Sequence, residues 1–302
     1  MKVFAHNFNP DSNSGPNKFT RTLFDCLIKD NKVKLSNQDE ADVEFCLIEQ
    51  QVHKVKPMVL RLDGIWFNSD QDYNRQNAPI KFSYHNADAV IFQSEFNKKL
   101  TEYWFGSHKN STVIHNASDL NLINLADSSV WDKKFKKDVE VWSCASNWRP
   151  HKRLKDNIRY FLEFAPKQAV LIVAGRNYNS QDVFDIVDDR IYFTGELDYT
   201  TLLSLYKRSS TFIHLAYLDH CPNVVVDAQA SGCVVICSST GGTSEIITKG
   251  KIINEKQWNF SPIKLYEPPK MDFDNCIEVI SKLDYDLESC SQKYYNIMRN
   301  LL

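Results

Sequence analysis

The sequence lacks the marks of a membrane or secreted protein. No stretch of its 302 residues approaches the 18 or more consecutive apolar residues that a membrane-spanning helix needs. The first residues, MKVFAHNFNPDSNSGP, contain no apolar segment of the kind found in signal peptides. We therefore expect a cytoplasmic protein without a transmembrane segment.

Cysteine pairs and clustered metal ligands are also missing. The eight cysteines form no CxxC pair, and several stand inside apolar, strand-like runs such as EFCLIE and CVVICSS. They are typical of reduced core residues in a reducing compartment. The sequence offers no cluster of His and Asp of the kind that holds a divalent cation, and we expect no metal.

Charge of one sign is not in excess either. The net charge is -2, with 43 % hydrophobic and 25 % charged residues, so bulk charge suggests neither nucleic acid nor an anionic membrane as a partner. A chain of this length is typical of two domains that each bury a core.

Short apolar runs rich in β-branched residues alternate with helix-length segments. The first series is KVFAHNF, VEFCLIE, PMVLRLD, AVIFQS and STVIHNA; the second is EVWSCAS, AVLIVAGR, RIYFTGEL, TFIHLAY and CVVICSS. Continuous apolar runs between helices predict parallel strands that are buried on both faces. We predict an α/β protein with two Rossmann-like parallel-sheet domains, over residues 1–125 and 139–302, joined by a linker at 126–138.

The last segment, residues 272–302, has the spacing of one or two amphipathic helices, with Ile277, Ile280, Leu283 and Leu287 on one face. Its last helix is a candidate for packing back on the first domain.

Ligands of parallel sheets gather at the carboxyl ends of strands, beside helix amino termini that favour anions. With two such sheets, we expect the ligand-binding site in a central cleft between the two domains. Gly15 lies in a tight turn before a helix and could meet a phosphate, or it could serve only that turn. Asp63 follows the strand PMVLR and is either a cap or a ligand of hydroxyl groups.

The second domain carries a basic loop after its first strand. Arg149, Lys152 and Arg153 crowd the start of a predicted helix, where the helix dipole prefers anions, so a bound diphosphate would explain them better than solvent. Gly175 and Gly195 end the next two strands and would let a flat ring or a ribose approach the backbone.

The stretch LDHCPNVVVDAQASGCVVICSSTGGTSEI is the richest in candidates. Asp219 stands in a loop after a strand, and Asp227 lies in the second turn of the short helix that follows. Asp219 could be a cap and Asp227 a satisfied buried acid, but their spacing favours a joint role in binding. The glycine turn TGGTSEI is expected to lead into a further helix.

This stretch closely resembles a family signature. D-x7-D followed by GCVVICSSTGGTSEI is similar to the "E-x7-E … G-x-P-V-I … GG-x-x-E-I" motif of retaining glycosyltransferases of family 4, which have the GT-B fold. PNVVVDA resembles that family's PNVVLEA, and RPHKR carries a lysine where the family has one. Further segments, ADAVIFQSEF and VIHNASD among them, match in the same order along nearly the whole chain.

The resemblance implies roles for individual residues. Asp219 would bind hydroxyls of the donor sugar, Asp227 the ribose, and Lys152 with Arg149 the diphosphate. Gly15 would lie beside the phosphates, and Asp63 near the reacting sugar. The further donor-binding candidates at matching motif positions are Gly175, Gly195, Asn223 and Val224.

The resemblance also implies partners and chemistry. We expect a metal-independent, retaining transferase that moves a hexose-like sugar from a UDP- or GDP-sugar to a hydroxyl of a glycan, lipid or small acceptor, with no cofactor. Fixed cations would stabilise the leaving phosphate and carboxylates the sugar ring. A lipid acceptor would place the protein peripherally at a membrane.

Two departures from the family keep alternatives open. Both glutamates of the signature are aspartates here, each shorter in reach by roughly 1.5 Å, and LDHCPN lacks the glycine of the usual EGFPN loop. The second hypothesis is therefore a catalytically silent GT-B subunit that binds nucleotide sugars. A GT-B epimerase or phosphorylase is a third, although a phosphorylase would be much longer.

Overall fold

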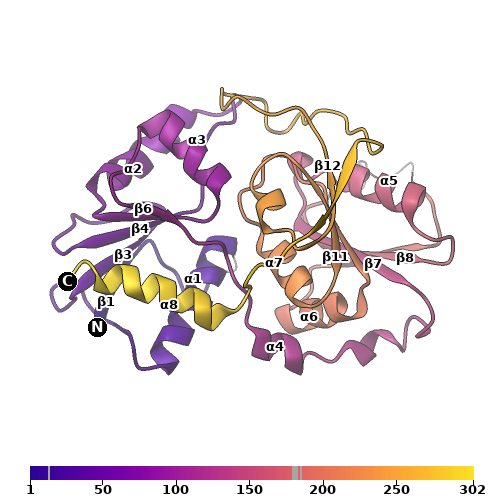
Figure 1. The fold of residues 1–302 in the computed structure, drawn as a ribbon, viewed down its shortest axis with the longest axis horizontal. Helices are drawn as coiled ribbons and strands as arrows, with labels where there is room; N and C mark the ends of the chain where they lie inside the picture. Colours follow the sequence, from indigo (N-terminus) through magenta and orange to yellow (C-terminus); the bar gives the residue numbers. More distant parts are fainter. Residues whose placement is uncertain (13, 179–182, 184–185) are drawn as a thin grey trace. The chain divides into compact units, whose positions relative to one another are not determined.

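The chain divides into two units in the computed structural model, which describes residues 1–12, 14–178, 183 and 186–302. Unit 1 consists of Met1–Asp119, Asn259–Ile263 and Asp284–Leu302, and unit 2 of Leu120–Trp258 and Lys264–Leu283. Each unit is built on one sheet with helices on its faces (Figure 1), which confirms the predicted α/β class with two parallel sheets.

The sheet of unit 1 has the order β2-β1-β3-β4-β5-β6, and all of its described pairings are parallel. Every residue of β3, β4 and β5 is buried, as expected for central strands covered on both faces. The strands are β1 (Lys2–His6), β2 (Lys34–Leu35), β3 (Val43–Leu47), β4 (Met58–Leu62), β5 (Ala89–Phe92) and β6 (Ser111–Val113).

Four helices cover this sheet, with α2 and α3 on one face and α1 and α8 on the other (Figure 1). Ser94 and Asp286 accept hydrogen bonds from backbone N–H groups in the first turns of α3 and α8, which fixes where these helices begin. Tyr294 of α8 is fully buried against the core of this unit. The helices are α1 (Gly15–Lys29), α2 (Tyr73–Asn86), α3 (Glu95–Phe105) and α8 (Leu287–Arg299).

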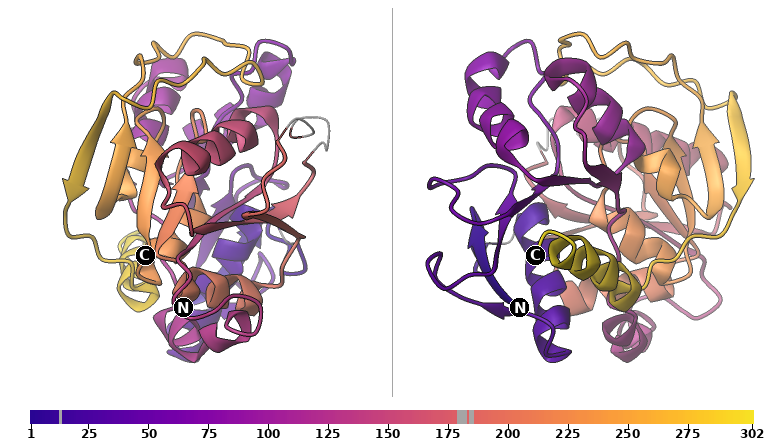
Figure 2. Two further views of the ribbon diagram at one scale, coloured as in Figure 1. Left: turned by 90° about the vertical axis from the view of Figure 1, so that its right-hand side faces the viewer. Right: turned by 60° about the vertical axis from the view of Figure 1, so that its left-hand side comes forward.

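The sheet of unit 2 has the order β13-β12-β11-β10-β7-β8-β9. Its pairings are parallel except for β13, which runs antiparallel to β12 at the edge; both views of Figure 2 show this edge strand. The strands are β7 (Val141–Asn147), β8 (Val170–Arg176), β9 (Ile191–Gly195), β10 (Thr211–His214), β11 (Val234–Ser238), β12 (Lys249–Ile253) and β13 (Cys276–Ile280).

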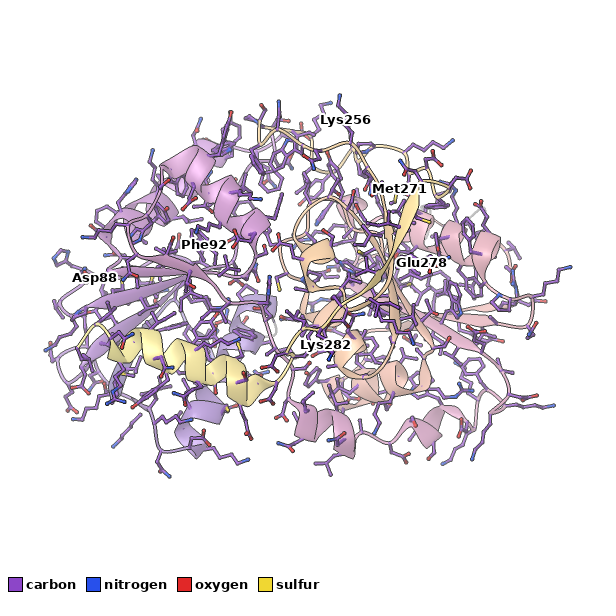
Figure 3. The ribbon with its side chains drawn as sticks, viewed as in Figure 1. Asp88, Phe92, Lys256, Met271, Glu278 and Lys282 are labelled. Atoms are coloured by element: carbon purple, nitrogen blue, oxygen red, sulfur yellow. The ribbon has the colours of Figure 1, made fainter. Side chains whose placement is uncertain are left out.

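One face of this sheet packs against α5, and the other against α6 and α7. Met271, labelled in Figure 3, and Phe273 return from a long segment after β12 and complete the core beside α5. The helices and single turns are α4 (Leu120–Leu125), η1 (Ser128–Trp131), η2 (Pro150–Lys152), α5 (Leu154–Phe164), α6 (Tyr199–Arg208), α7 (Asn223–Ala230) and η4 (Thr243–Ile246).

The division into units differs from the predicted boundaries in three internal segments. Residues 120–125, predicted for the first domain, belong to unit 2. Residues 126–138, predicted to be a linker, belong to unit 2: Trp131 is buried there and its Nε1 donates to Ser204 Oγ at 2.9 Å. Residues 259–263, predicted for the second domain, pair with unit 1, where Trp104 Nε1 donates to the Phe260 carbonyl at 2.8 Å. The buried Trp131 and the partly buried Trp104 hold residues 126–138 and 259–263 in place.

The predicted helical face around Ile277 and Ile280 is wrong, because these residues lie in β13. The alternation in CIEVI suits an edge strand, and Lys251 of β12 forms an exposed ion pair with Glu278 across the pairing. Figure 3 labels Glu278 on this strand. Ile277 and Ile280 are 51 % and 90 % exposed, so the two residues do not form the buried face of a helix that their spacing predicted. The helix predicted after TGGTSEI is only the single turn η4.

The backbone of β7 lies against Gly175 of β8. A Cβ atom there would lie 1.8 Å from the Ser146 carbonyl oxygen, and Gly175 has a φ of +115°. Gly232, after α7, has a φ of +101° but open space around its Cα. Of these two glycines, only Gly175 therefore combines a left-handed backbone with a steric block.

We expect Gly175→Ala to destabilise unit 2 by about 2 kcal/mol more than Gly232→Ala. Both variants place an alanine at an unfavourable positive φ, but only the first adds a steric clash. The free energy of unfolding from urea denaturation measures the difference. Equal losses in the two variants would contradict the steric argument.

Candidate active site

The carboxylate of Asp219 is the centre of a polar cluster in unit 2. Asp219 follows β10, and Lys152 ends the turn η2 that follows β7, so both stand at the carboxyl edge of the sheet. Lys152 Nζ donates to Asp219 Oδ2 at 2.5 Å, and His214 Nε2 lies 2.9 Å from the same oxygen. The backbone N–H of His220 donates to Oδ1 at 3.0 Å.

The backbone around Asp219 is tightly held. Leu218 has a φ of +56°, an unusual value for a leucine, and the Gly242 N–H donates to the Asp219 carbonyl at 2.7 Å. A Cβ at Gly241 would lie 2.4 Å from that carbonyl oxygen, and Gly241 itself has a φ of +82°. The glycine turn of TGGTSEI therefore lets one loop lie against the other and fixes where Asp219 stands.

The cluster keeps Asp219 ionised. Burial alone would raise the pKa of Asp219, but the ammonium of Lys152 and the hydrogen bond from His214 together hold it well below its usual value. Burial lowers the pKa of His214 despite its bond to Asp219, which favours the neutral imidazole. The side chains of Lys152 and Asp219 are 18 % and 16 % exposed, which leaves both within reach of a ligand.

The turn η2 presents Lys152 through local hydrogen bonds. The Lys152 N–H donates to the Arg149 carbonyl at 2.8 Å, and the Tyr217 N–H donates to the His151 carbonyl at 2.7 Å, which ties the turn to the segment after β10. The His151 ring stacks on Tyr266, with 5.5 Å between ring centroids. Arg149, just before the turn, has an exposed side chain.

The three cations of the basic loop have separate environments. Arg153 points into the protein, where its guanidinium makes paired hydrogen bonds of 2.8 and 2.7 Å with Glu255 and is 3 % exposed. The predicted association of Arg153 with a diphosphate is therefore wrong, because a buried carboxylate already neutralises it. Glu255 gave no sequence signal, since it lies about 100 residues away in a polar segment.

Asp227 lies in the second turn of α7 and is 4 % exposed. The hydroxyl of Tyr199, at the start of α6, donates to its Oδ1 at 3.1 Å. Asn223 and Val224, in the first turn of α7, are half-buried. The sequence did not single out Tyr199, because only the packing of α6 on α7 brings it there.

The predicted glycines differ in what requires them. Gly175 is fixed by the neighbouring strand β7, so its lack of a side chain has a structural reason already. Gly195 ends β9 with a φ of +71° and open space around its Cα, which leaves room for an approaching ligand.

Asp63 and Gly15 belong to unit 1. Arg61 of β4, fully buried, forms an ion pair with Asp63 and donates to Asn116 Oδ1 at 2.9 Å and Tyr294 Oη at 3.2 Å. Burial raises the pKa of Asp63, although Arg61 opposes the shift. Gly15 is the exposed first residue of α1. Arg61 was missed because an arginine inside an apolar run gives no hint of its partners.

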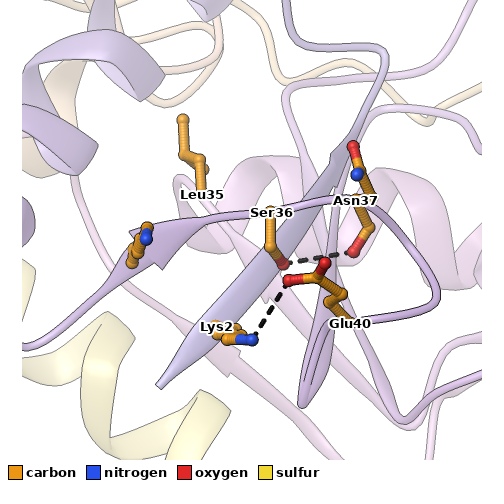
Figure 4. A pocket seen from close by; sticks show the side chains of 6 residues that line it. Lys2, Leu35, Ser36, Asn37 and Glu40 are labelled. Carbon is orange, nitrogen blue, oxygen red and sulfur yellow. Dashed lines mark hydrogen bonds and ion pairs between the residues drawn. The ribbon is translucent and has the colours of Figure 1, made fainter.

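A surface pocket of about 450 Å³ also occurs in unit 1, at the starts of β1 and β2 (Figure 4). An exposed ion pair between Lys2 and Glu40 stands at its wall. Ligands of parallel sheets bind at the opposite, carboxyl edge, so we assign this pocket no role.

The expectation of no clustered Asp ligand motif is wrong, because the Asp-x-Asp tripeptide occurs three times, a spacing that can hold a cation. In the structure, Asp72 and Asp286 cap helices and Asp272 bonds the N–H of Asp274. No group of three or more acidic, His or Cys residues suited to a metal ion occurs among the described residues.

Comparison with known proteins identifies the enzyme class. Residues 127–260 match the family model described as "Glycosyl transferases group 1". A search of curated proteins finds no match for this sequence.

Solved structures that resemble the whole chain share little sequence with it. Anabaena HepE in complex with UDP-glucose is 14 % identical with a TM-score of 0.70, and the match covers 99 % of this chain and 100 % of that one. Sucrose-phosphate synthase from Thermosynechococcus elongatus is 12 % identical with a TM-score of 0.73, covering 100 % and 99 %. WaaG, a glycosyltransferase involved in lipopolysaccharide biosynthesis, is 11 % identical with a TM-score of 0.63, covering 88 % and 89 %.

These likenesses confirm the predicted GT-B fold, and the family match over 127–260 confirms the predicted glycosyltransferase. No helix among the described residues is both long and apolar enough to cross a membrane.

The buried histidine beside the site predicts a pH effect. Burial and the nearby Lys152 lower the pKa of His151 to about 3. The unfolded chain therefore takes up a proton near pH 6.5 that the folded unit does not, and the free energy of unfolding should fall as the pH drops below 6.5, by at most about 1.4 kcal/mol per pH unit. Between pH 7 and 4.5, urea denaturation should show a shallower decline for His151→Phe.

The control is His53→Gln, which changes an exposed histidine of unit 1. It should decline with pH as the unmodified protein does. A decline in His151→Phe as steep as that of the unmodified protein would contradict the assignment.

Proposed function

We propose that this protein is a retaining, metal-independent glycosyltransferase. It would transfer a hexose-like sugar from a UDP- or GDP-sugar to a hydroxyl of a glycan, lipid or small acceptor. The observation that carries the proposal is the pair formed by Lys152 and Asp219, a cation and an ionised acid held together and within reach at the carboxyl edge of a parallel sheet. A cytoplasmic location, peripheral to a membrane for a lipid acceptor, stays a prediction.

The cations suit the leaving group. Cleavage of the bond between the anomeric carbon and the diphosphate leaves negative charge on the phosphate oxygens, which a fixed ammonium stabilises strongly in a site of low dielectric. Lys152 is the partly buried candidate, and the exposed Arg149 three residues earlier could close over the same phosphates. Arg153 is excluded from this role by its pairing with Glu255.

The carboxylates suit the sugars of the donor. An ionised aspartate only accepts hydrogen bonds, and a hexose or ribose offers hydroxyl donors. We assign Asp219 to the transferred sugar and Asp227 to the ribose, with Asn223 and Val224 alongside and Gly195 leaving room for the nucleoside. We also propose Gly175 as a residue near the donor, although the close contact with β7 already requires a glycine at this position. HepE was solved with UDP-glucose, which supports a UDP-sugar as the first donor to test.

The acceptor side is assigned to unit 1. Asp63, held by Arg61, and Gly15, at the start of α1, are the proposed contacts there, Gly15 toward the phosphates and Asp63 toward the reacting sugar. In the proposed reaction the acceptor hydroxyl attacks the anomeric carbon from the face that the diphosphate leaves, and the leaving phosphate takes the hydroxyl proton. The configuration at the anomeric carbon is thereby retained.

The alternative is a catalytically silent subunit that binds nucleotide sugars. Its support is the shorter reach of Asp219 and Asp227 compared with the glutamates of the family signature. The presence of both Lys152 and Asp219 favours an active enzyme, because fixed charges beside the leaving phosphate and the sugar serve the chemical step as well as binding.

Purified protein should hydrolyse one of a panel of UDP- and GDP-sugars slowly without an acceptor, in the presence of EDTA. Proton NMR of the released sugar should show the anomeric configuration of the donor, before it equilibrates in water. A raised melting temperature with a nucleotide sugar that is never turned over would instead establish the silent subunit. Inversion, or loss of activity in EDTA, would overturn the corresponding part of the proposal.

Asp219→Ala and Lys152→Ala should each lower kcat about a hundredfold or more, since each removes one preorganised electrostatic contact. Lys155→Ala, an exposed lysine in the first turn of α5, is the matched control and should keep the activity of the unmodified protein. Steady-state kinetics with the donor found in the panel measure the effect. Activity within tenfold of normal in either site variant would sink the assignment.

A further inference from the structure

His214 shares the carboxylate of Asp219 with Lys152, and no sequence pattern pointed to a role for it. It is the last residue of β10 and is 4 % exposed, with its Nε2 2.9 Å from Asp219 Oδ2. Its ring lies parallel to that of Phe212, two residues earlier on the same face of the strand, with centroids 6.3 Å apart. The imidazole is therefore held in place on one side and bonded on the other.

The chemistry of the contact fixes the direction of the hydrogen bond. Asp219 is ionised, and an ionised carboxylate can only accept, so the proton of the bond belongs to His214 Nε2. The groups that face the imidazole are Asp219 and Lys152, with His151 nearby on η2. Beside Lys152 a second cation would be unfavourable, and a neutral imidazole donates its hydrogen bond without adding one.

We propose that His214 is a positioning residue for Asp219, the residue that binds the donor sugar. His214 holds the Asp219 carboxylate through an Nε2–H hydrogen bond to Oδ2. This inference rests on the proposed function. Lys152 and His214 bond the same oxygen, but a donor diphosphate would attract the Lys152 ammonium and weaken its hold on Asp219. The His214 bond lies inside the protein and keeps Asp219 ionised and oriented when that happens.

Two variants separate hydrogen bonding from packing. His214→Leu replaces the imidazole with an apolar side chain of similar size and removes the hydrogen-bond donor. His214→Gln places an amide N–H near the position of Nε2. We expect His214→Leu to lower kcat/KM by about ten- to a hundredfold, the range for loss of a hydrogen bond to a charged group, and His214→Gln to recover most of it.

The pH dependence of kcat/KM is the measurement that a merely structural role of His214 would not change. Because the proposed function needs Asp219 ionised, we expect the acid limb of kcat/KM to follow Asp219 in the free enzyme. Loss of the hydrogen bond to the ionised carboxylate raises the pKa of Asp219. The limb should move to higher pH in His214→Leu and return in His214→Gln. Ile213→Val, a loss of packing at the adjacent buried residue of β10, is the control and should leave the limb in place. A limb unmoved in His214→Leu would overturn the inference while leaving the proposed function intact.

A second measurement does not depend on activity. Long-range ¹⁵N–¹H NMR of the histidine rings, with His214 assigned from the signal lost in His214→Gln, reports which ring nitrogen carries the proton. We expect a neutral ring protonated at Nε2 from pH 6 to 8. A ring protonated at Nδ1 would overturn the inference even if the proposed function failed and no donor were turned over.

Discussion

The site in unit 2 depends on one ionised carboxylate that is kept in a largely buried place. Burial of Asp219 opposes its charge, and only the ammonium of Lys152 with the hydrogen bonds of His214 and the His220 N–H makes that charge stable. These partners come from the turn after β7 and from β10 with the loop that follows it, so the ionisation of Asp219 and the position of Lys152 depend on each other. A ligand that binds one of the two necessarily acts on the other.

The backbone is built around this pair at some conformational cost. Leu218 adopts a left-handed conformation directly before Asp219, and Gly241 lets the following loop lie against the Asp219 carbonyl. On the other side, Arg153 carries a left-handed φ of +52° and is buried against Glu255, which anchors the turn that presents Lys152. One buried ion pair thus holds the scaffold, and a partly exposed one stands at the carboxyl edge of the sheet.

Much of the fold and part of the site could be predicted from local pattern. Continuous apolar runs identified the central strands of both sheets, because strands covered on both faces leave no polar alternation. The edge strand β13 was predicted to be a helix from the spacing of Ile277 and Ile280. Both side chains are exposed, so their spacing did not reflect a buried face. Arg153 was grouped with Lys152 by its neighbourhood in sequence, although a neighbouring residue can point to the opposite side of a turn.

The sequence by itself determined the α/β class, because buried strands and helices are visible in short segments, and the resemblance of its paired aspartates and basic loop to a family signature indicated a glycosyltransferase. Tertiary structure alone decided which charges meet. His214 with Asp219, Glu255 with Arg153, Tyr199 with Asp227 and Arg61 with Asp63 are fixed by the order of strands and the packing of helices. The free energy of a buried charge depends on every group around it, and those groups come from distant parts of the chain.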